Sequence, residues 1–134
     1  MLVWFVSGHG LGHAARTAEI VRHLPPEIPV TVVTASPAWF WSETFGERVR
    51  VVPDAFDVGC VQRNSLDVDV AATREAVRAV RERNAARRGE LARWLREVGA
   101  RVVVCDVASF PLAVAAEIGV PGVCVANFTW AEIY

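Results

Sequence analysis

The sequence predicts an α/β protein with a Rossmann-like, doubly wound parallel sheet. Short apolar runs alternate along the chain with segments whose apolar residues recur every three or four positions. This alternation is typical of strands joined by crossover helices, which makes neighbouring strands parallel. Glycine and proline separate most of these segments, and glycines crowd the turn after the first apolar run. For five such strands we expect the order 3-2-1-4-5.

The strands are predicted from runs of β-branched and other apolar residues. The fourth run is continuously apolar, so we expect that strand to be buried on both faces of the sheet. The predicted strands are 2–7, 29–34, 48–52, 101–106 and 122–126.

Four helices are predicted between these strands. Pro25 and Pro26 stop the first helix, while Ser36 and Pro37 fit the N-cap and the first helical position of the second. The third is long and free of proline, with room for a kink near Gly89. The predicted helices are 14–24, 37–45, 67–98 and 109–118. The third is expected to turn inward Val70, Val77, Val80, Leu91, Leu95 and Val98.

Composition predicts a single cytoplasmic domain over residues 1–134. The chain is 53% hydrophobic, enough for one core, and its net charge of -1 gives no basic field for nucleic acid. Its apolar runs are too short to span a membrane, and no signal-like leader precedes the first strand. Cys60, Cys105 and Cys124 form an odd, scattered set, which fits reduced, buried thiols.

Two groups of side chains have both a functional and a structural interpretation. Many of the 14 basic residues, all arginine, lie in the third predicted helix, where interspersed acids favour a solvated face over a polyanion site. Trp39 and Trp41 either stack on a sugar ring or pack on the sheet.

The turn after the first strand is the strongest functional signal. It reads GHGLGH and places His9 and His13 among Gly8, Gly10 and Gly12. Glycine permits tight backbone angles and the close approach of a ligand, and the following helix favours a phosphate or another anion. A histidine in this turn can take a proton from a substrate at neutral pH.

Better-known glycine motifs do not fit this turn. A P-loop needs a lysine, which the chain lacks, and the dinucleotide fingerprint needs wider spacing and an acidic residue where the second strand runs into Thr34, Ala35 and Ser36. His9 and His13 have the spacing of zinc ligands on a helix, but no glutamate follows His9. We therefore expect neither NAD nor a metal, and no cofactor.

The predicted topology brings Asp106 opposite the glycine turn. Ligands bind such sheets beyond the carboxyl ends of the strands where the strand order reverses, here strands one and four. Asp106 can then orient His13 as a general base, or merely accept hydrogen bonds from loop N–H groups. Arg16 meets a ligand phosphate or carboxylate, or pairs with Asp106 or Glu19. His9 either contacts the ligand or only hydrogen-bonds the loop backbone.

Four segments together resemble the N-terminal lobe of GT-B glycosyltransferase-like proteins. The resemblance is strongest to the glycosyltransferase-like region before the sugar-kinase domain of plant L-arabinokinases, and to its bacterial relatives. It covers nearly the whole chain. The segments are GHGLGHAAR (8–16), DVGCVQRNSLD (57–67), VVVCD (102–106) and VCVANFTW (123–130).

The resemblance implies an inverting transferase that moves a sugar from a nucleotide sugar to a hydroxyl of a small sugar or glycan acceptor. His13 would be the base that activates the acceptor, with Asp106 as its support, and backbone N–H groups would stabilise the departing diphosphate. Substrate contacts are expected from Gly8, His9, Gly10, Gly12, Arg16, Asp57, Gln62, Asn64 and Asn127.

Such an enzyme needs a second lobe for the donor nucleotide. The resemblance therefore implies a partner C-terminal lobe or a fused domain, without which this chain would bind weakly and turn over nothing. The alternative is a non-catalytic sugar or sugar-nucleotide sensing module attached to another domain such as a sugar kinase. A base that is needed for transfer would distinguish the two interpretations.

Overall fold

The computed structural model describes residues 1–133, which contain one five-stranded sheet. The strands pair in parallel in the order β3-β2-β1-β4-β5. The predicted α/β class and strand order are therefore confirmed. The strands are β1 (Leu2–Val6), β2 (Val30–Thr34), β3 (Val49–Pro53), β4 (Val102–Asp106) and β5 (Gly122–Cys124).

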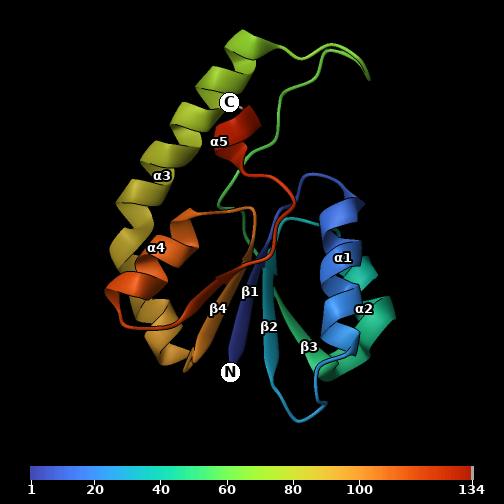
Figure 1. Ribbon diagram of the computed structural model, residues 1–134, viewed down its shortest axis with the longest axis vertical. Helices are drawn as coiled ribbons and strands as arrows, with labels where there is room; N and C mark the ends of the chain where they lie inside the picture. The colour runs from blue at the N-terminus through green and yellow to red at the C-terminus, as the bar shows by residue number, and fades with distance from the viewer. Residues whose placement is uncertain (134) are drawn as a thin grey trace.

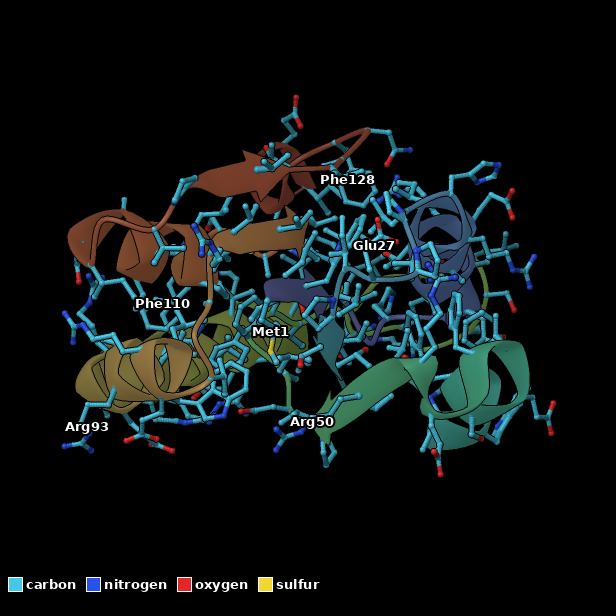
Figure 2. All side chains as sticks on the ribbon, turned by 90° about the horizontal axis from the view of Figure 1, so that it is seen from below. Met1, Glu27, Arg50, Arg93, Phe110 and Phe128 are labelled. Carbon is cyan, nitrogen blue, oxygen red and sulfur yellow. The ribbon has the colours of Figure 1, made fainter. Side chains whose placement is uncertain are left out.

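Helices cover both faces of the sheet (Figure 1). On one side lie α1 (Leu11–Arg22) and α2 (Ala38–Phe45), and on the other lie α3 (Val70–Glu97) and α4 (Phe110–Glu117). The view from below in Figure 2 shows these two layers, with Phe110 on the α4 side. A 3₁₀ helix, η1 (Gly46–Arg48), leads into β3, and α5 (Trp130–Ile133) lies beside α3.

Two hydrophobic cores form because successive residues of a strand point to opposite faces of the sheet. In the central strand β1, Trp4 packs toward α1 and α2, whereas Phe5 packs toward α3 and α4. Both are almost fully buried. Burial of the sheet on both faces explains why the central strands are continuously apolar.

Helix α1 begins three residues before the predicted start. Gly10, with φ of +83°, is its N-cap, and Gly12 lies in its first turn. Glycine is tolerated there because the first N–H groups of a helix have no partner within the helix. His13 consequently belongs to the helix itself, which restricts where its ring can point.

Helix α2 is not capped as predicted, because Ser36 has another role. Pro37 is the N-cap, while the Ser36 hydroxyl accepts hydrogen bonds from the Trp41 indole at 2.8 Å and the Thr34 hydroxyl at 3.0 Å. Trp41 is fully buried, so of its two interpretations the structure selects packing. Trp39 is 54% exposed.

Helix α3 is continuous through Gly89, where a kink was considered. Asp69 caps its start by accepting a hydrogen bond from the Ala72 N–H at 2.9 Å. The inward position predicted for Val70 is wrong, since its side chain is 66% exposed. Within residues 1–133, no helix combines the length and the apolar character needed to cross a bilayer.

The three thiols are free, and their surroundings differ. Cys105 is buried in β4, and this burial raises the pKa of its thiol. Cys60 is half-buried and Cys124 is exposed on β5. The prediction of buried thiols is therefore correct for Cys105 and wrong for Cys124.

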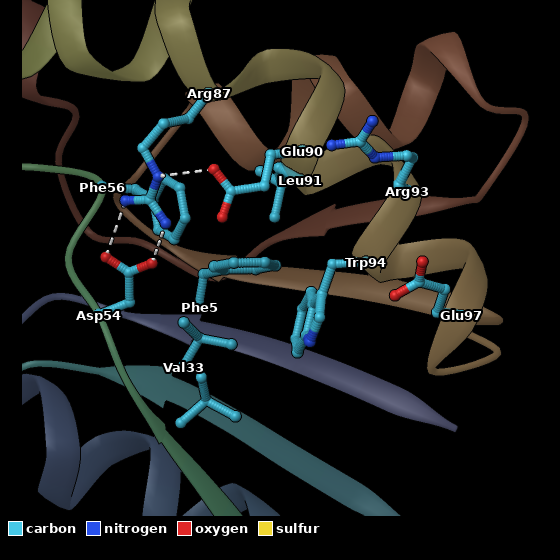
Figure 3. A pocket seen from close by; sticks show the side chains of 11 residues that line it. Phe5, Val33, Asp54, Phe56, Arg87, Glu90, Leu91, Arg93, Trp94 and Glu97 are labelled. Atoms are coloured by element: carbon cyan, nitrogen blue, oxygen red, sulfur yellow. Dashed lines mark hydrogen bonds and ion pairs between the residues drawn. The ribbon is translucent and has the colours of Figure 1, made fainter.

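A cavity of about 360 Å³ lies between α3 and strands β1 to β3 (Figure 3). Phe5 and Trp94 form part of its apolar wall, and Asp54 and Arg87 form an ion pair at its edge. The guanidinium of Arg87 also lies 5.1 Å from the centre of the Phe56 ring. The cavity lies across the sheet from α1.

The contact between Gly8 and the turn after β2 gives the first prediction. A Cβ at Gly8 would lie 2.8 Å from the Cβ of Ala35, closer than real Cβ atoms come. We expect Gly8→Ala to lower the free energy of unfolding, measured with urea, by about 1–3 kcal/mol. Ala35→Gly in the same chain should restore part of the loss. Gly12→Ala, whose Cβ would meet no atom within 4 Å, is the control, and an equal effect there would contradict the argument.

The Asp54–Arg87 pair predicts a pH-dependent contribution to stability. Burial alone would raise the pKa of Asp54, but hydrogen bonds from Arg87 and from the Ala55 N–H outweigh it and hold that pKa below its usual value. Because the folded chain prefers the carboxylate, the pair stabilises at neutral pH, and this contribution is lost as the pH falls below about 4.

We expect Arg87→Met to lower the free energy of unfolding by about 1 kcal/mol at neutral pH. The difference from the parent chain should shrink in urea titrations as the pH falls below the usual pKa of aspartate and then through the lowered pKa of Asp54, because Asp54 becomes protonated in the folded parent chain as well. Arg93→Met, an exposed change on the same helix, is the control. A loss that is independent of pH would show that Arg87 acts through packing alone.

Candidate active site

The strand register places the candidate site at the carboxyl ends of β1 and β4. Val6, the last residue of β1, pairs directly with Asp106, the last residue of β4. The glycine turn follows Val6, so it lies beside Asp106, as the predicted topology requires.

Asp106 is the centre of the polar network. It is fully buried, and one carboxylate oxygen accepts a hydrogen bond from Nδ1 of His13 at 2.9 Å. The other oxygen accepts a hydrogen bond from the Arg16 guanidinium. A buried carboxylate is costly unless charged or hydrogen-bonding partners compensate it, and these two side chains of α1 provide them.

This contact determines which nitrogen of His13 is available. An ionised carboxylate only accepts hydrogen bonds, so Nδ1 carries the proton and Nε2 of the neutral ring is an acceptor. The His13 side chain remains 13% exposed, and its ring makes an edge contact with Phe128 at 6.1 Å. The geometry suits a base that takes a proton on Nε2, although the catalytic role itself stays a prediction.

Arg16 connects α1 with the segment after β5. Besides Asp106, its guanidinium donates to Oδ1 of Asn127 at 3.0 Å. Of the two acidic partners considered for Arg16, the structure selects Asp106, while Glu19 pairs with Arg22. The side chain remains 30% exposed, so the guanidinium also reaches the surface of the site.

The backbone is strained directly after Asp106. Val107 has φ of +71°, a left-handed conformation that a β-branched residue rarely adopts and that costs about 1–3 kcal/mol. Such strain persists only where the surroundings impose it. Here it turns the chain sharply at the end of β4, beside the buried carboxylate.

His9 lies between the glycine turn and the loop after β3. A Cβ at Gly59 would come within 2.2 Å of Nδ1 of His9, so only glycine allows this approach. The His9 ring also makes an edge contact with the Trp130 ring at 6.2 Å. His9 thus packs where three separate segments meet.

Trp130 and Asp57 join the segment after β5 to the loop after β3. The Trp130 indole donates to Oδ2 of Asp57 at 2.8 Å. Phe128 packs edge-on against Trp130 at 5.4 Å and also contacts His13. An aromatic wall therefore runs from the His13 imidazole to the Asp57 carboxylate.

Two predicted contact residues, Gln62 and Asn64, lie in the exposed part of the loop after β3. Asn64 hydrogen-bonds Asp67 and the Leu66 N–H, closing a local turn, and Gln62 forms an isolated bridge with Val68. In the part of the chain that the structure describes, no hydrogen bond joins either residue to His13 or Asp106. Their role in binding an acceptor stays a prediction.

The start of α1 offers a second kind of contact. Gly10 provides no capping side chain, so the first-turn N–H groups have no side-chain partner. The positive end of the helix dipole and these donors form a position suited to an anion. The backbone that is predicted to contact a ligand thus lies in the turn that contains Gly8, Gly10 and Gly12.

Asn84 was not predicted as a site residue. It lies on α3, is only 4% exposed, and donates to the Phe56 carbonyl oxygen at 2.8 Å. The sequence does contain a signal, because Asn84 has helical spacing from the inward positions Val77 and Leu91. A lone amide on an apolar helix face marks either a buried hydrogen bond or a ligand contact.

The Asp106 network predicts strong coupling between its members. We expect Arg16→Met to lower the free energy of unfolding by about 3 kcal/mol, because Asp106 then stays buried without its cation. Asp106→Asn in the same chain should recover much of this loss. Arg22→Met, which removes an exposed pair with Glu19, should cost less than about 1 kcal/mol in the same urea titrations. If the losses of unfolding free energy from Arg16→Met and Asp106→Asn simply add in the double variant, the charge pairing is not what stabilises this network.

No family model matches the sequence. The chain is 38% identical over 138 residues to L-arabinokinase from Arabidopsis thaliana; the match covers the whole chain but only 13% of that protein.

Among solved structures, the fold is similar to UGT2 of Phytolacca americana, complexed with UDP-2fluoro-glucose and pterostilbene. The match has a TM-score of 0.59 and 15% identity, and it covers 93% of this chain and 30% of UGT2. The C-terminal domain of a Pyrococcus furiosus hydrogenase matches with a TM-score of 0.54 and 14% identity, over 92% of this chain and 89% of that domain. At such identities the likeness shows the fold alone. Together, the comparisons show that the chain is similar in sequence to one segment of L-arabinokinase and that it shares its fold with the lobe of a GT-B glycosyltransferase.

Proposed function

We propose that this domain is the acceptor-binding half of an inverting glycosyltransferase that uses a nucleotide-sugar donor. The observation that carries the proposal is the hydrogen bond between His13 and the buried Asp106 at the switch point of the sheet. An imidazole held by a carboxylate, with its second nitrogen free to accept a proton, is the arrangement of an oriented general base.

In the proposed reaction an acceptor hydroxyl donates its proton to Nε2 of His13. The hydroxyl oxygen attacks the anomeric carbon of the donor sugar, and the bond from that carbon to the nucleoside diphosphate breaks. The diphosphate leaves with the bonding electron pair, and the configuration at the anomeric carbon inverts. Asp106 holds the ring in the required tautomer and stabilises the imidazolium that forms.

The departing diphosphate needs stabilisation that this chain can provide in part. The uncapped start of α1 and the exposed side of Arg16 present N–H donors near His13. Such donors stabilise negative charge that develops as the bond breaks. The donor nucleotide itself would rest on a second lobe, since this chain spans 30% of UGT2.

A sensing module is the second candidate function. The observation that favours it is the similarity to one segment of L-arabinokinase, a protein whose name describes a kinase. In that case the same site at the carboxyl ends of β1 and β4 would bind a sugar or a sugar nucleotide and control an attached domain. His13 and Asp106 would then contribute to affinity only.

The two candidates differ in what His13→Ala does within the complete polypeptide. If His13 is the base, sugar transfer, measured as UDP release from UDP-sugars in the presence of free monosaccharides, should fall by about 10²–10⁴-fold. Donor affinity should change little, because the contact that is lost belongs to the transition state. His23→Ala, an exposed change near the end of the same helix, is the control. Loss of affinity without a loss of turnover would favour the sensing module.

A further inference from the structure

Cys105 and Cys124 lie side by side on the last two strands of the sheet. They are direct register partners of β4 and β5, and the Val125 N–H donates to the Cys105 carbonyl oxygen at 2.9 Å, as a parallel pair centred on these two residues requires. Neighbouring strands lie about 4.7–4.9 Å apart. The Cα atoms of a disulfide are usually about 4.4–6.8 Å apart. The register therefore gives the two cysteines a backbone separation that a disulfide can bridge.

Both cysteine side chains lie on the face of the sheet that α3 and α4 cover. Cys105 belongs to the hydrophobic core on that face. On β5, a Cβ at Gly122 would meet Leu112 of α4, and Val125 packs against the core on the opposite face. Because side chains alternate along a strand, Cys124 shares the face of Gly122 and therefore of Cys105.

The two thiols differ in accessibility, which sets the order in which they react. Cys124 is exposed, whereas Cys105 has no exposed surface. Burial and the neighbouring Cys124 both raise the pKa of the Cys105 thiol. Since the accessible thiolate is the form that an oxidant attacks, Cys124 is oxidised first and Cys105 is the thiol that then closes the bond.

We propose that Cys105 and Cys124 form a reversible disulfide that couples oxidation of the chain to the geometry of the candidate site. Cys105 directly precedes Asp106, and Cys124 lies shortly before Asn127, which accepts a hydrogen bond from Arg16. A disulfide holds its Cβ atoms about 3.8 Å apart, closer than the spacing of the strands. The bond therefore draws β5, the short edge strand at the top of Figure 2, toward β4, and the segment with Asn127 moves with it. The proposal is independent of the proposed function.

The oxidant that the proposal requires is a peroxide. The Cys124 thiolate attacks one oxygen of hydrogen peroxide, the O–O bond breaks, and the departing hydroxide takes a proton to give water, which leaves a sulfenic acid on Cys124. The Cys105 sulfur then attacks the sulfenic sulfur, an S–S bond forms, and the S–O bond breaks. The second hydroxide takes the Cys105 proton and leaves as water. Two electrons pass from the two sulfurs to the peroxide, and a dithiol reverses the bond by becoming a disulfide itself.

The first test maps the bond in the folded chain. We would treat the Cys60→Ser chain with excess hydrogen peroxide, block the remaining thiols and cleave after glutamate. Glu117 lies between the two cysteines, so a disulfide leaves the peptides on its two sides joined until dithiothreitol separates them. We expect joined peptides from a single chain to be the main product. Separate peptides with an oxidised Cys124, or disulfides between two chains only, would overturn the proposal.

Single substitutions test the order of the two steps. In Cys60→Ser chains that also carry Cys105→Ala, Cys124 should stop at the sulfenic acid, which dimedone traps, and then pass to the sulfinic acid. With Cys124→Ser instead, the buried Cys105 should keep its thiol under the same treatment. Rapid oxidation of Cys105 in that chain would overturn the proposed order. If Cys105→Ala fails to fold, the exposed change Cys124→Ser and the peptide map decide.

A second measurement tests the coupling to the site. In ¹⁵N spectra of the Cys60→Ser chain, the side-chain signals of Asn127 and Arg16 should shift on oxidation and return after dithiothreitol. The side-chain signal of Arg22, at the far end of α1, is the control and should stay in place. A disulfide that forms without these shifts would overturn the coupling. Equal shifts in the Cys105→Ala chain would also overturn it, because oxidation of Cys124 alone would then be the cause.

Discussion

The burial of the Asp106 carboxylate is the constraint on which the candidate site depends. A carboxylate without exposure at the end of a central strand must be compensated, and within residues 1–133 the side chains that donate to it, His13 and Arg16, both come from α1. This requirement fixes the direction of the first turn of α1, and with it the His13 ring. Arg16 extends this constraint to the segment after β5. Its guanidinium also donates a hydrogen bond to Asn127, which positions that segment.

Close backbone approaches complete the arrangement around this carboxylate. Gly8 lets the turn after β1 pass against Ala35, and Gly59 lets the loop after β3 reach the His9 ring. Any side chain at either position would separate segments that the site needs together. The hydrogen bond from the Trp130 indole to Asp57 joins the segment after β5 to the loop after β3. Together with the turns after β1 and β2, four segments distant in sequence therefore meet at one edge of the sheet.

Hydrophobic periodicity was sufficient to predict the sheet order, because topology follows from which segments are buried and how they are connected. It also predicted that Asp106 would face the glycine turn. Boundaries set by a single hydrogen bond could not be predicted in this way: Ser36 has the chemistry of an N-cap, yet its hydroxyl is used by Trp41. Asn84 escaped prediction for a similar reason, since its partner, the Phe56 carbonyl, lies 28 residues away in a loop without periodicity.

The fold by itself does not determine the chemistry, since a hydrogenase domain and a glycosyltransferase lobe share it with this chain. What distinguishes a base from a binding residue here is how the Asp106 charge is shared. His13 and Arg16 bind opposite oxygens of one carboxylate, so the cation offsets the charge while the hydrogen bond to Nδ1 still orients the ring. Under the proposed function, orientation without excess negative charge would suit a site that also accepts a diphosphate close by. The same network would then combine a base for the acceptor with a surface that does not repel the anionic donor, which is the combination that sugar transfer requires.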